Sequence, residues 1–324
     1  MADMYREADR GKSLAIASFL PYLGPALGPI LGGVVTHSVA WPWIFWIMSL
    51  FNAAITMLGL LLIRESYTPV LLRRKAQKSK AGSVQTLRSW SFWQEFFSQL
   101  SGNLARPVLL LARRPVIQVL AVLLALDFGV YTFLLSTFAT LYIERYGQSE
   151  SVSSLHYIAI AIGSSASGQI GGRIMDFVYR RLRDRSPDKQ GRPEFRVPWM
   201  VPGVILTPVG LFWYGWSAER GVSWPVVDVG AAVFVLGSFV TSQALLAYQL
   251  DEFVEYGASA NAATKLFSYI LGFAFPVFAP RLYEGLGYGW GNSLLAFVWI
   301  ALVFPVPFVL WLWGDKLRAW GREK

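Results

Sequence analysis

The 324-residue sequence contains no cysteine and only two histidines, His37 and His156. Without cysteine the chain has no disulfide framework, no thiolate metal ligand and no thiol nucleophile. Two histidines are too few for a histidine-based metal site. The sequence also shows no serine–histidine–acid set, no phosphate-binding loop and no paired metal-binding carboxylates. We therefore expect a protein that is not an enzyme and that has no metal or other cofactor.

Charge is the second feature that is scarce. Charged residues make up 15% of the chain and hydrophobic residues 54%, whereas soluble domains carry about 25% charged residues. The first twelve residues include several charged side chains, and the apolar run after them is long enough to cross a membrane. The start is therefore not a secretory signal. The composition predicts a membrane protein.

The apolar residues are gathered into stretches of about 20 or more, the length that a membrane-spanning helix needs. Eight stretches qualify: 13–36, 41–63, 115–142, 152–175, 198–217, 225–250, 259–283 and 291–313. If the start is cytoplasmic, the inner segments hold 26 Lys and Arg residues, and the outer loops hold only Arg145, Arg220 and Arg281. This positive-inside asymmetry predicts two cytoplasmic termini. It also explains the net charge of +9 without nucleic acid as a partner.

The one long connection, 64–114, separates two spans from six. Within it, bulky apolar side chains recur at helical spacing, at Trp90, Trp93, Phe97, Leu100 and Leu104. This pattern predicts an amphipathic helix. Such a helix would lie on the inner leaflet of the membrane or pack on the base of the bundle, and the pattern does not choose between the two.

Glycine and proline alternate near the start of the chain, at Gly24, Pro25, Gly28, Pro29, Gly32 and Gly33. The glycines at every fourth position fall on one helix face, where small residues let another helix approach closely. The prolines remove backbone donors and bend the helix. The stretch is either a packing seam or a bent helix at a moving interface.

These residues resemble the antiporter motif in the fifth of the twelve helices of the major facilitator superfamily. Asp3-Met4 and Arg10-Gly11-Lys12 likewise resemble that family's loop between helices four and five. The resemblance implies that the chain begins at the fifth helix and lacks the first four.

The second half of the chain carries further motifs, among them Arg113-Arg114-Pro115, Pro193-Glu194-Phe195-Arg196-Val197-Pro198 and Tyr248-Gln249-Leu250-Asp251. Together they resemble the fungal drug:proton antiporter branch of the superfamily, whose members include polyamine, azole-drug and toxin exporters. The implied fold is an all-α membrane protein, a major facilitator fold truncated at its N-terminus, with about eight transmembrane helices. The implied regions are a two-span remnant of the N-terminal half, a cytoplasmic central loop, a six-helix C-terminal half and a cytoplasmic tail, at 1–63, 64–114, 115–314 and 315–324.

A second stripe of small residues, Gly163, Ser167 and Gly171, lies on one face of the predicted span 152–175. The resemblance makes 13–36 and 152–175 the family's fifth and eighth helices, which face each other between the two halves. Small faces there would suit the rocking of one half against the other, although ordinary close packing needs the same residues.

The stripe is followed by a charged group: Gly172, Arg173, Asp176, Arg180 and Arg181. It resembles a degenerate copy of the superfamily's loop motif, in which a carboxylate pairs with an arginine or a helix N-terminus to lock one transport state. Plain positive-inside charge explains the arginines equally well. We expect Asp251 and Glu252, at another inner helix end, to be solvated.

Asp127 lies near the midplane of the span 115–142, with Tyr131 one turn further along the same face. A charge at that depth is expensive, so an intramembrane carboxylate is a candidate for proton or substrate handling. Ser242 and Gln243 lie well inside the span 225–250. The resemblance makes these two spans cavity-lining helices, while an interhelical hydrogen bond is the alternative role for Ser242 and Gln243.

The resemblance as a whole implies a multi-pass protein of the plasma membrane that exports small organic molecules in exchange for protons. Its partners would be the organic substrate, protons and the lipid bilayer, and its mechanism alternating access. The alternative is a membrane protein that does not transport and instead binds a partner, because the substrate site of such folds lies between two halves. An integral-membrane enzyme is a weaker third class, because no catalytic set is present.

Overall fold

The computed structural model describes residues 24, 27–33, 35, 40–62, 71–72, 75, 94, 98, 105–253 and 256–320. Within these residues every element is a helix and no strand occurs. The helices are α2 (Pro42–Leu62), α5 (Pro115–Tyr146), α6 (Glu150–Leu155), α7 (Tyr157–Ala166), η1 (Ser167–Gly171), α8 (Gly172–Arg185), η2 (Pro193–Arg196), α9 (Val197–Glu219), α10 (Trp224–Glu252), α11 (Gly257–Val303) and α12 (Val306–Trp320). The prediction of an all-α fold is confirmed.

Five helical stretches in the described part are long and apolar enough to cross a membrane: Pro42–Leu62, Pro115–Tyr146, Pro193–Glu219, Trp224–Glu252 and Gly257–Trp320. The first four coincide with the predicted spans 41–63, 115–142, 198–217 and 225–250. The fifth contains both 259–283 and 291–313, which the sequence separates. The chain is therefore a multi-pass membrane protein.

Two of the eight predicted spans are not among these five stretches. The stretch 152–175 is helical up to Arg185, but it is divided into α6, α7, the π-helical η1 and α8. The stretch 13–36 lies largely outside the described residues, of which 27–33 are helical. The aromatic stripe of the predicted amphipathic helix also lies outside them, and the described helix 105–113 leads directly into α5.

The last two predicted spans meet at Gly287, with no loop between them. Gly287 has φ 71° and ψ 175° inside α11, a left-handed conformation that favours glycine. The side chain of Glu219, at the end of α9, accepts a hydrogen bond from the backbone N–H of Gly289 at 3.1 Å. A single glycine and one carboxylate thus make the reversal for which the sequence predicted a connecting segment.

Helices α9 and α10 pack closely because each carries glycines where they meet. On α9 these are Gly203 and Gly210, and on α10 they are Gly230 and Gly237. A Cβ at Gly237 would lie 2.5 Å from the backbone nitrogen of Thr207 on α9, and a Cβ at Gly203 would lie 2.7 Å from the backbone oxygen of Gly237. Small residues at such positions allow two membrane helices to touch through their backbones.

The second small-residue stripe also packs against α10. A Cβ at Gly163 would lie 2.5 Å from the backbone oxygen of Ala232 on α10. By contrast, a Cβ at Gly24, Gly28 or Gly32 would meet no atom within 4 Å, as placed here. The described residues therefore form no contact between the two glycine stripes, because α10 already occupies the face of α7. That the stripes meet at a moving interface stays a prediction.

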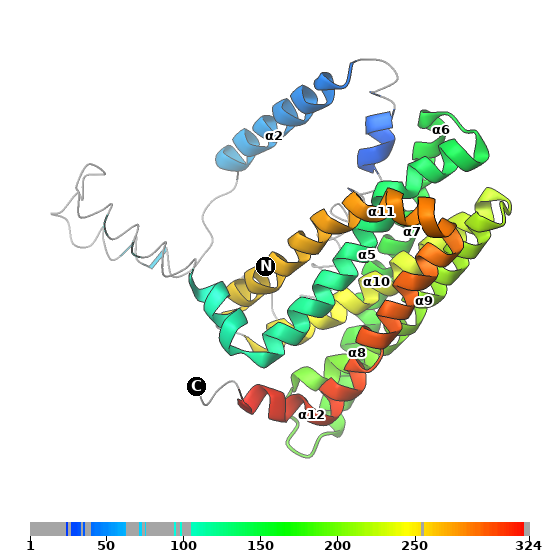
Figure 1. Ribbon diagram of the computed structural model, residues 1–324. Coiled ribbons are helices and arrows are strands. Elements are labelled where there is room, and N and C mark those ends of the chain that lie inside the picture. Colours follow the sequence, from blue (N-terminus) through cyan, green and yellow to red (C-terminus); the bar gives the residue numbers. More distant parts are fainter. Residues whose placement is uncertain are drawn as a thin grey trace.

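The core lies within the bundle of α5 and α7 to α12. Its largest fully buried side chains include Trp299, Tyr142, Tyr214, Tyr248, Phe133 and Phe138. Helix α2 has no buried residue, and Figure 1 shows it apart from the bundle. The bundle covers the predicted six-helix half, 115–314, and the division of the whole chain into four regions stays a prediction.

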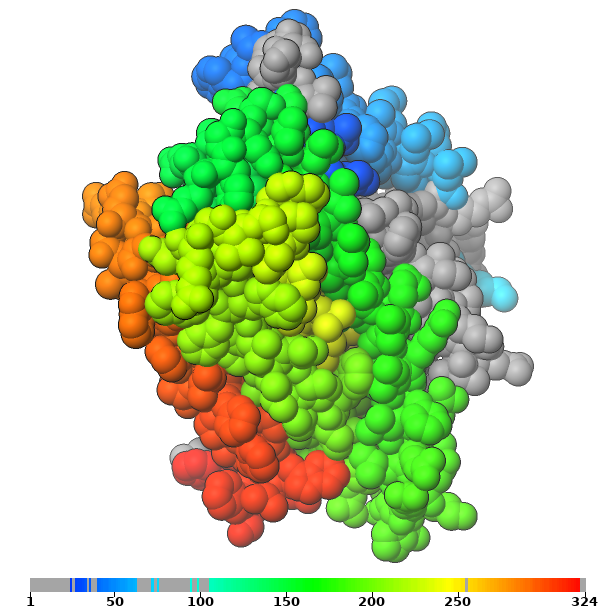
Figure 2. All heavy atoms as spheres, turned by 90° about the vertical axis from the view of Figure 1, so that its right-hand side faces the viewer, coloured from blue at the N-terminus to red at the C-terminus, as the bar shows by residue number. Residues whose placement is uncertain are grey.

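The bundle has two distinct ends. Helix α6 lies at one end and α12 at the other, and the end of α8 lies beside that of α12 (Figures 1 and 2). In Figure 2 the lime and yellow helices α9 and α10 fill the middle of the face between them. The positive-inside asymmetry makes the end with α8 and α12 the predicted inner end.

Candidate functional site

Asp127 is buried in the middle of the bundle, on α5, with 4% of its surface exposed. Both of its carboxylate oxygens accept hydrogen bonds from α10. The hydroxyl of Ser238 donates to Oδ1 at 2.8 Å, and that of Ser242 donates to Oδ2. The two serines are four residues apart, so they lie on one helix face. The carboxylate is thus satisfied by neutral donors, and no arginine pairs with it among the described residues.

Lys265 of α11 supplies a positive charge that acts on this carboxylate. It acts on Asp127 electrostatically, and its Nζ lies 5.6 Å from the ring centroid of Phe128. Lys265 lies near the start of α11, which packs along α5. Asp127 therefore links three helices: its own, the serine face of α10 and the lysine of α11.

Tyr131 follows Asp127 by one turn and is also buried, with 7% of its surface exposed. Its ring packs edge-to-face on Phe239 of α10, with centroids 5.5 Å apart. Its hydroxyl has no hydrogen-bond partner in the described part of the chain. Buried polar groups are rarely left unpaired, so this hydroxyl is unusual.

Gln243 faces a different neighbour from Ser242. Its Oε1 lies 3.1 Å from where a Cβ of Gly171 would be, and the ring of Trp199 lies 3.4 Å from the same point. The hydroxyl of Ser167 and the indole N–H of Trp199 are buried without a partner among the described residues. Together with Tyr131, these groups put three unused hydrogen-bonding atoms on α5, η1 and α9, all of which face α10.

A cavity of about 480 Å³ lies elsewhere in the structure. It is lined by Ala112, Arg113, Pro115, Gln118 and Trp320, at the inner end of the bundle. We base the site on the buried polar groups around Asp127, because they carry the chemistry.

The predicted gate residue Asp176, on α8, forms an ion pair, but with a residue outside the predicted group. Arg196 of η2 donates to Asp176 at 3.0 Å and to Asp251 of α10 at 2.8 Å. Its guanidinium also lies 4.0 Å from the ring centroid of Tyr179. The expectation that Asp251 is solvated is wrong in part, because Arg196 binds its carboxylate between α8 and α10, although 28% of the side chain stays exposed.

The other predicted gate residues do not join this ion pair. Arg180 donates from Nε to the backbone oxygen of Asp176 at 3.2 Å, and the guanidinium of Arg181 lies 6.0 Å from the ring centroid of Phe177. Gly172 faces open space. Among the described residues, Arg196 alone forms an ion pair with Asp176, so a role for Arg173, Arg180 and Arg181 in gating stays a prediction.

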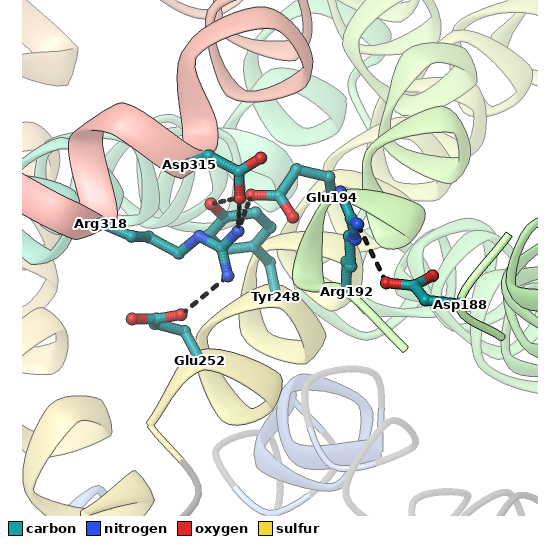
Figure 3. Close-up of polar contacts among 7 residues, drawn as sticks. All are labelled: Asp188, Arg192, Glu194, Tyr248, Glu252, Asp315 and Arg318. Carbon is teal, nitrogen blue, oxygen red and sulfur yellow. Dashed lines mark hydrogen bonds and ion pairs between the residues drawn. The ribbon is translucent and has the colours of Figure 1, made fainter. Parts of the chain in front are cut away.

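A second arginine, Arg318 of α12, gathers three carboxylates at the same end of the bundle (Figure 3). It binds Glu194 of η2 at 2.8 Å, Glu252 of α10 at 3.1 Å and Asp315 on its own helix. Tyr248 donates to Glu194 at 3.4 Å. The side chain of Glu252 is only 4% exposed, so the expectation that it is solvated is also wrong. Helix α12 supplies the arginine that binds it.

An exposed pair lies beside this network, outside the membrane-spanning part. Arg192 binds Asp188 at 3.1 Å, and the hydroxyl of Ser186 donates to the same carboxylate at 2.5 Å. The Ser186 hydroxyl and Arg192 both favour the charged form, and they hold the pKa of Asp188 at about 2. Because both partners are exposed to water, this pair stabilises the fold little.

The sequence singles out Asp127, Tyr131, Ser242 and Asp176 as candidates, and their functional roles stay predictions. Ser238, Lys265, Arg196 and Arg318 are neighbours that the structure adds. Ser238 could have been predicted from the sequence, because it lies one turn before Ser242 on the same face of a predicted span. The two arginines had no signal in the sequence beyond positive-inside charge. Their partners lie 55 and 66 residues away along the chain, so only the packed fold brings them together.

Comparison with known proteins gives a consistent result. The family model described as Major Facilitator Superfamily matches residues 1–276. The chain is 40% identical to the probable efflux pump mfs2 of Aspergillus flavus, over 100% of this chain and 77% of that protein. It is 36% identical to an uncharacterized transporter of Schizosaccharomyces pombe and 33% identical to the efflux pump vrtL of Penicillium aethiopicum. These two alignments cover 98% of this chain, which spans 65% and 63% of those relatives.

Proposed function

Because the chain belongs to the major facilitator superfamily, whose members are transporters and not enzymes, we propose that it exports small organic molecules in exchange for protons. The observation that carries this proposal is Asp127, a buried carboxylate in mid-span that is held by two serine hydroxyls. The relatives named as efflux pumps support export as the direction. Their printed names do not give a substrate.

The neighbours of Asp127 can bind its carboxyl group both with and without a proton. A serine hydroxyl can donate a hydrogen bond to a carboxylate or accept one from a carboxylic acid. Ser238 and Ser242 can therefore serve both protonation states of Asp127 without leaving a buried cation behind. An arginine in their place could not, because it has no acceptor and stays charged.

Protonation of Asp127 would also change the attraction between helices. The ionised carboxylate on α5 attracts Lys265 on α11, and the neutral acid does not. The free energy of that attraction would then depend on whether a proton is bound. This is the differential interaction that any ligand needs in order to shift a conformational equilibrium. Proton binding would thus bias the position of α11 against α5.

Substrate would bind beside this carboxylate. Tyr131, Ser167 and Trp199 supply buried hydrogen-bonding groups without partners among the described residues, and Gln243 lies next to two of them. Apolar and aromatic walls with a few polar groups are typical of sites for small organic ligands. In this proposal Asp176 acts as the charge lock of the inner end through Arg196, and the glycines of 24–33 form the moving contact between halves.

Asp127→Asn tests the proposal, because it keeps the shape of the side chain and removes the titration. Purified protein in lipid vesicles would be given an imposed pH gradient and a panel of fluorescent organic dyes, with Asp188→Asn as a matched control on the exposed loop. We expect Asp127→Asn to abolish uphill dye export while expression and membrane insertion stay near normal. Uphill export with wild-type pH dependence in that variant would overturn the proposal. A wild-type protein that moves no dye would favour a partner-binding role.

We further propose that the protein lies in the plasma membrane with both termini in the cytoplasm. The charge asymmetry of the sequence supports this orientation. A chain without cysteine makes the test simple, because one introduced thiol is the only one present. A thiol at Ser38 should react with an impermeant reagent from outside intact cells, and one at Ser83 should not. The reverse labelling would contradict the orientation.

A further inference from the structure

A half-buried carboxylate lies at the end of the bundle opposite to Arg196 and Arg318. Asp228, near the start of α10, accepts a hydrogen bond from the hydroxyl of Tyr142 on α5. Its other oxygen lies 2.8 Å from Nδ1 of His156. The second ring nitrogen of His156, Nε2, lies 2.8 Å from Oε1 of Gln148. His156 sits at the junction of α6 and α7, so the cluster joins α5, the α6–α7 junction and α10.

The two sides of the imidazole ring are not equivalent. Since Asp228 accepts from Tyr142, its carboxylate also needs a donor at its other oxygen, and this fixes the proton of His156 on Nδ1. The other nitrogen faces a side-chain amide, which can present either an oxygen or an N–H group. With the Gln148 oxygen towards Nε2, the ring carries two protons and is charged. With the amide turned over, Nε2 accepts a hydrogen bond and the ring is neutral.

Aromatic rings enclose the imidazole. The ring of Tyr142 stacks on the imidazole, with centroids 3.7 Å apart and planes within 2°, and Trp224 packs its ring edge-to-face at 5.1 Å. Aromatic faces attract cations. His156 itself is 7% exposed, but Gln148, on the loop after α5, is half-buried. A proton can therefore reach Nε2 from the solvent side when the amide of Gln148 turns.

The other charged and titratable groups at this end have partners of their own. Tyr146 of α5 donates to the backbone oxygen of Val222. Arg145 of α5 donates to the backbone oxygen of Glu219, whose carboxylate binds the start of the second part of α11. Glu150 of α6 is exposed. Of the described residues, Asp228 is therefore the one charged group that contacts the ring.

We infer that His156, Asp228 and Gln148 form a proton-binding site at the α6 end of the molecule, separate from Asp127. The proton adds to Nε2 of His156, and the Gln148 amide turns its oxygen to accept the new N–H. Asp228 holds the positive charge, and Tyr142 holds Asp228. In the orientation proposed above, this end faces the outside of the cell.

The composition allows a direct test, because His156 is one of only two histidines. His37→Gln leaves it as the only histidine in the protein. Nuclear magnetic resonance of isotope-labelled histidine in the detergent-solubilised full chain would then report one ring. When the buffer is taken from about pH 9 to about pH 5, we expect its nitrogen and carbon signals to change as Nε2 gains a proton, with Nδ1 protonated throughout.

Two variants in this background should shift the titration in opposite directions. Asp228→Asn removes the negative charge, so we expect the proton affinity of His156 to fall by roughly tenfold, one pH unit. Gln148→Glu offers a carboxylate to Nε2, so we expect the affinity to rise. Asp188→Asn, at the other end of the bundle, should leave the titration unchanged. Gln148 is only half-buried, so we expect Gln148→Glu to fold. Its titration therefore tests the inference even if Asp228→Asn does not fold.

A His156 signal that stays constant over this range, or opposite variants that leave its midpoint in place, would overturn the inference. The measurement uses no substrate and does not involve Asp127. Its failure is therefore distinguishable from failure of the proposed export activity, which Asp127→Asn tests.

Discussion

The inner end of the bundle and the middle of the bundle both bury carboxylates, but they satisfy them differently. At the inner end, Arg196 and Arg318 bind Asp176, Asp251, Glu194 and Glu252. In mid-span, the donors to Asp127 are the hydroxyls of two serines. An arginine stays protonated at any physiological pH, whereas a hydroxyl is neutral and can reverse its hydrogen bond.

The difference separates a structural role from a titrating one. A carboxylate that loses its charge beside a buried arginine leaves that arginine unpaired, which is strongly destabilising. The inner carboxylates are therefore expected to hold α8, η2, α10 and α12 together. Asp127 carries no such penalty, because its direct partners are neutral. The same fold thus contains carboxylates that fasten helices and, in the proposed function, one that can change its proton.

The largest effect should come from breaking the inner network. Arg318→Met removes the cation and leaves Glu194, Glu252 and Asp315 facing one another. Because Glu252 is almost fully buried, we expect the free energy of unfolding to fall by roughly 3–5 kcal/mol. The readout is the unfolding midpoint in detergent, with Asp188→Asn as a control that should show no measurable change.

The comparison can be sharpened by adding Glu194→Gln and Glu252→Gln to the Arg318→Met variant. If uncompensated charge is the cause, the combined variant should regain a large part of the lost stability. A combined variant that is less stable still would show that Arg318 acts through packing of its side chain and not through charge.

A smaller effect is expected at the mid-span site. Ser238→Ala and Ser242→Ala each remove one hydrogen bond to a charged group, which is worth about 1.5–3 kcal/mol. In an Asp127→Asn background the same changes should cost less, because the acceptor is no longer charged. The double-mutant cycle, read from unfolding midpoints, measures the coupling. Equal costs in both backgrounds would mean that the serines do not bind the charged form.

The sequence predicted the helices well where each span forms its own apolar stretch, as in α5, α9 and α10. It failed at Gly287, because a reversal made by one glycine leaves no polar loop to read. It also could not predict that α10 occupies the face of Gly163. A stripe of small residues indicates that another helix can approach closely, but it does not indicate which helix does so.

The sequence predicts the candidate site in part, because it indicates the central carboxylate but not its partners. A lone carboxylate in mid-span is visible in the sequence because its cost in lipid is high wherever it lies. Its partners are not visible, because Ser238 and Lys265 are ordinary residues until the fold places them near Asp127. The same holds for His156 and Asp228, which are 72 residues apart along the chain and 2.8 Å apart in the structure.

The central claim, that Asp127 changes its protonation state, can be measured without any substrate. Infrared difference spectra of the protein in lipid vesicles, recorded between alkaline and mildly acidic buffer, report the band of a protonated carboxyl group. We predict that this band appears in the wild-type protein and is lost in Asp127→Asn, while Glu194→Gln and Asp251→Asn leave it in place. A band that persists unchanged in Asp127→Asn, or that disappears with an inner carboxylate, would contradict the account.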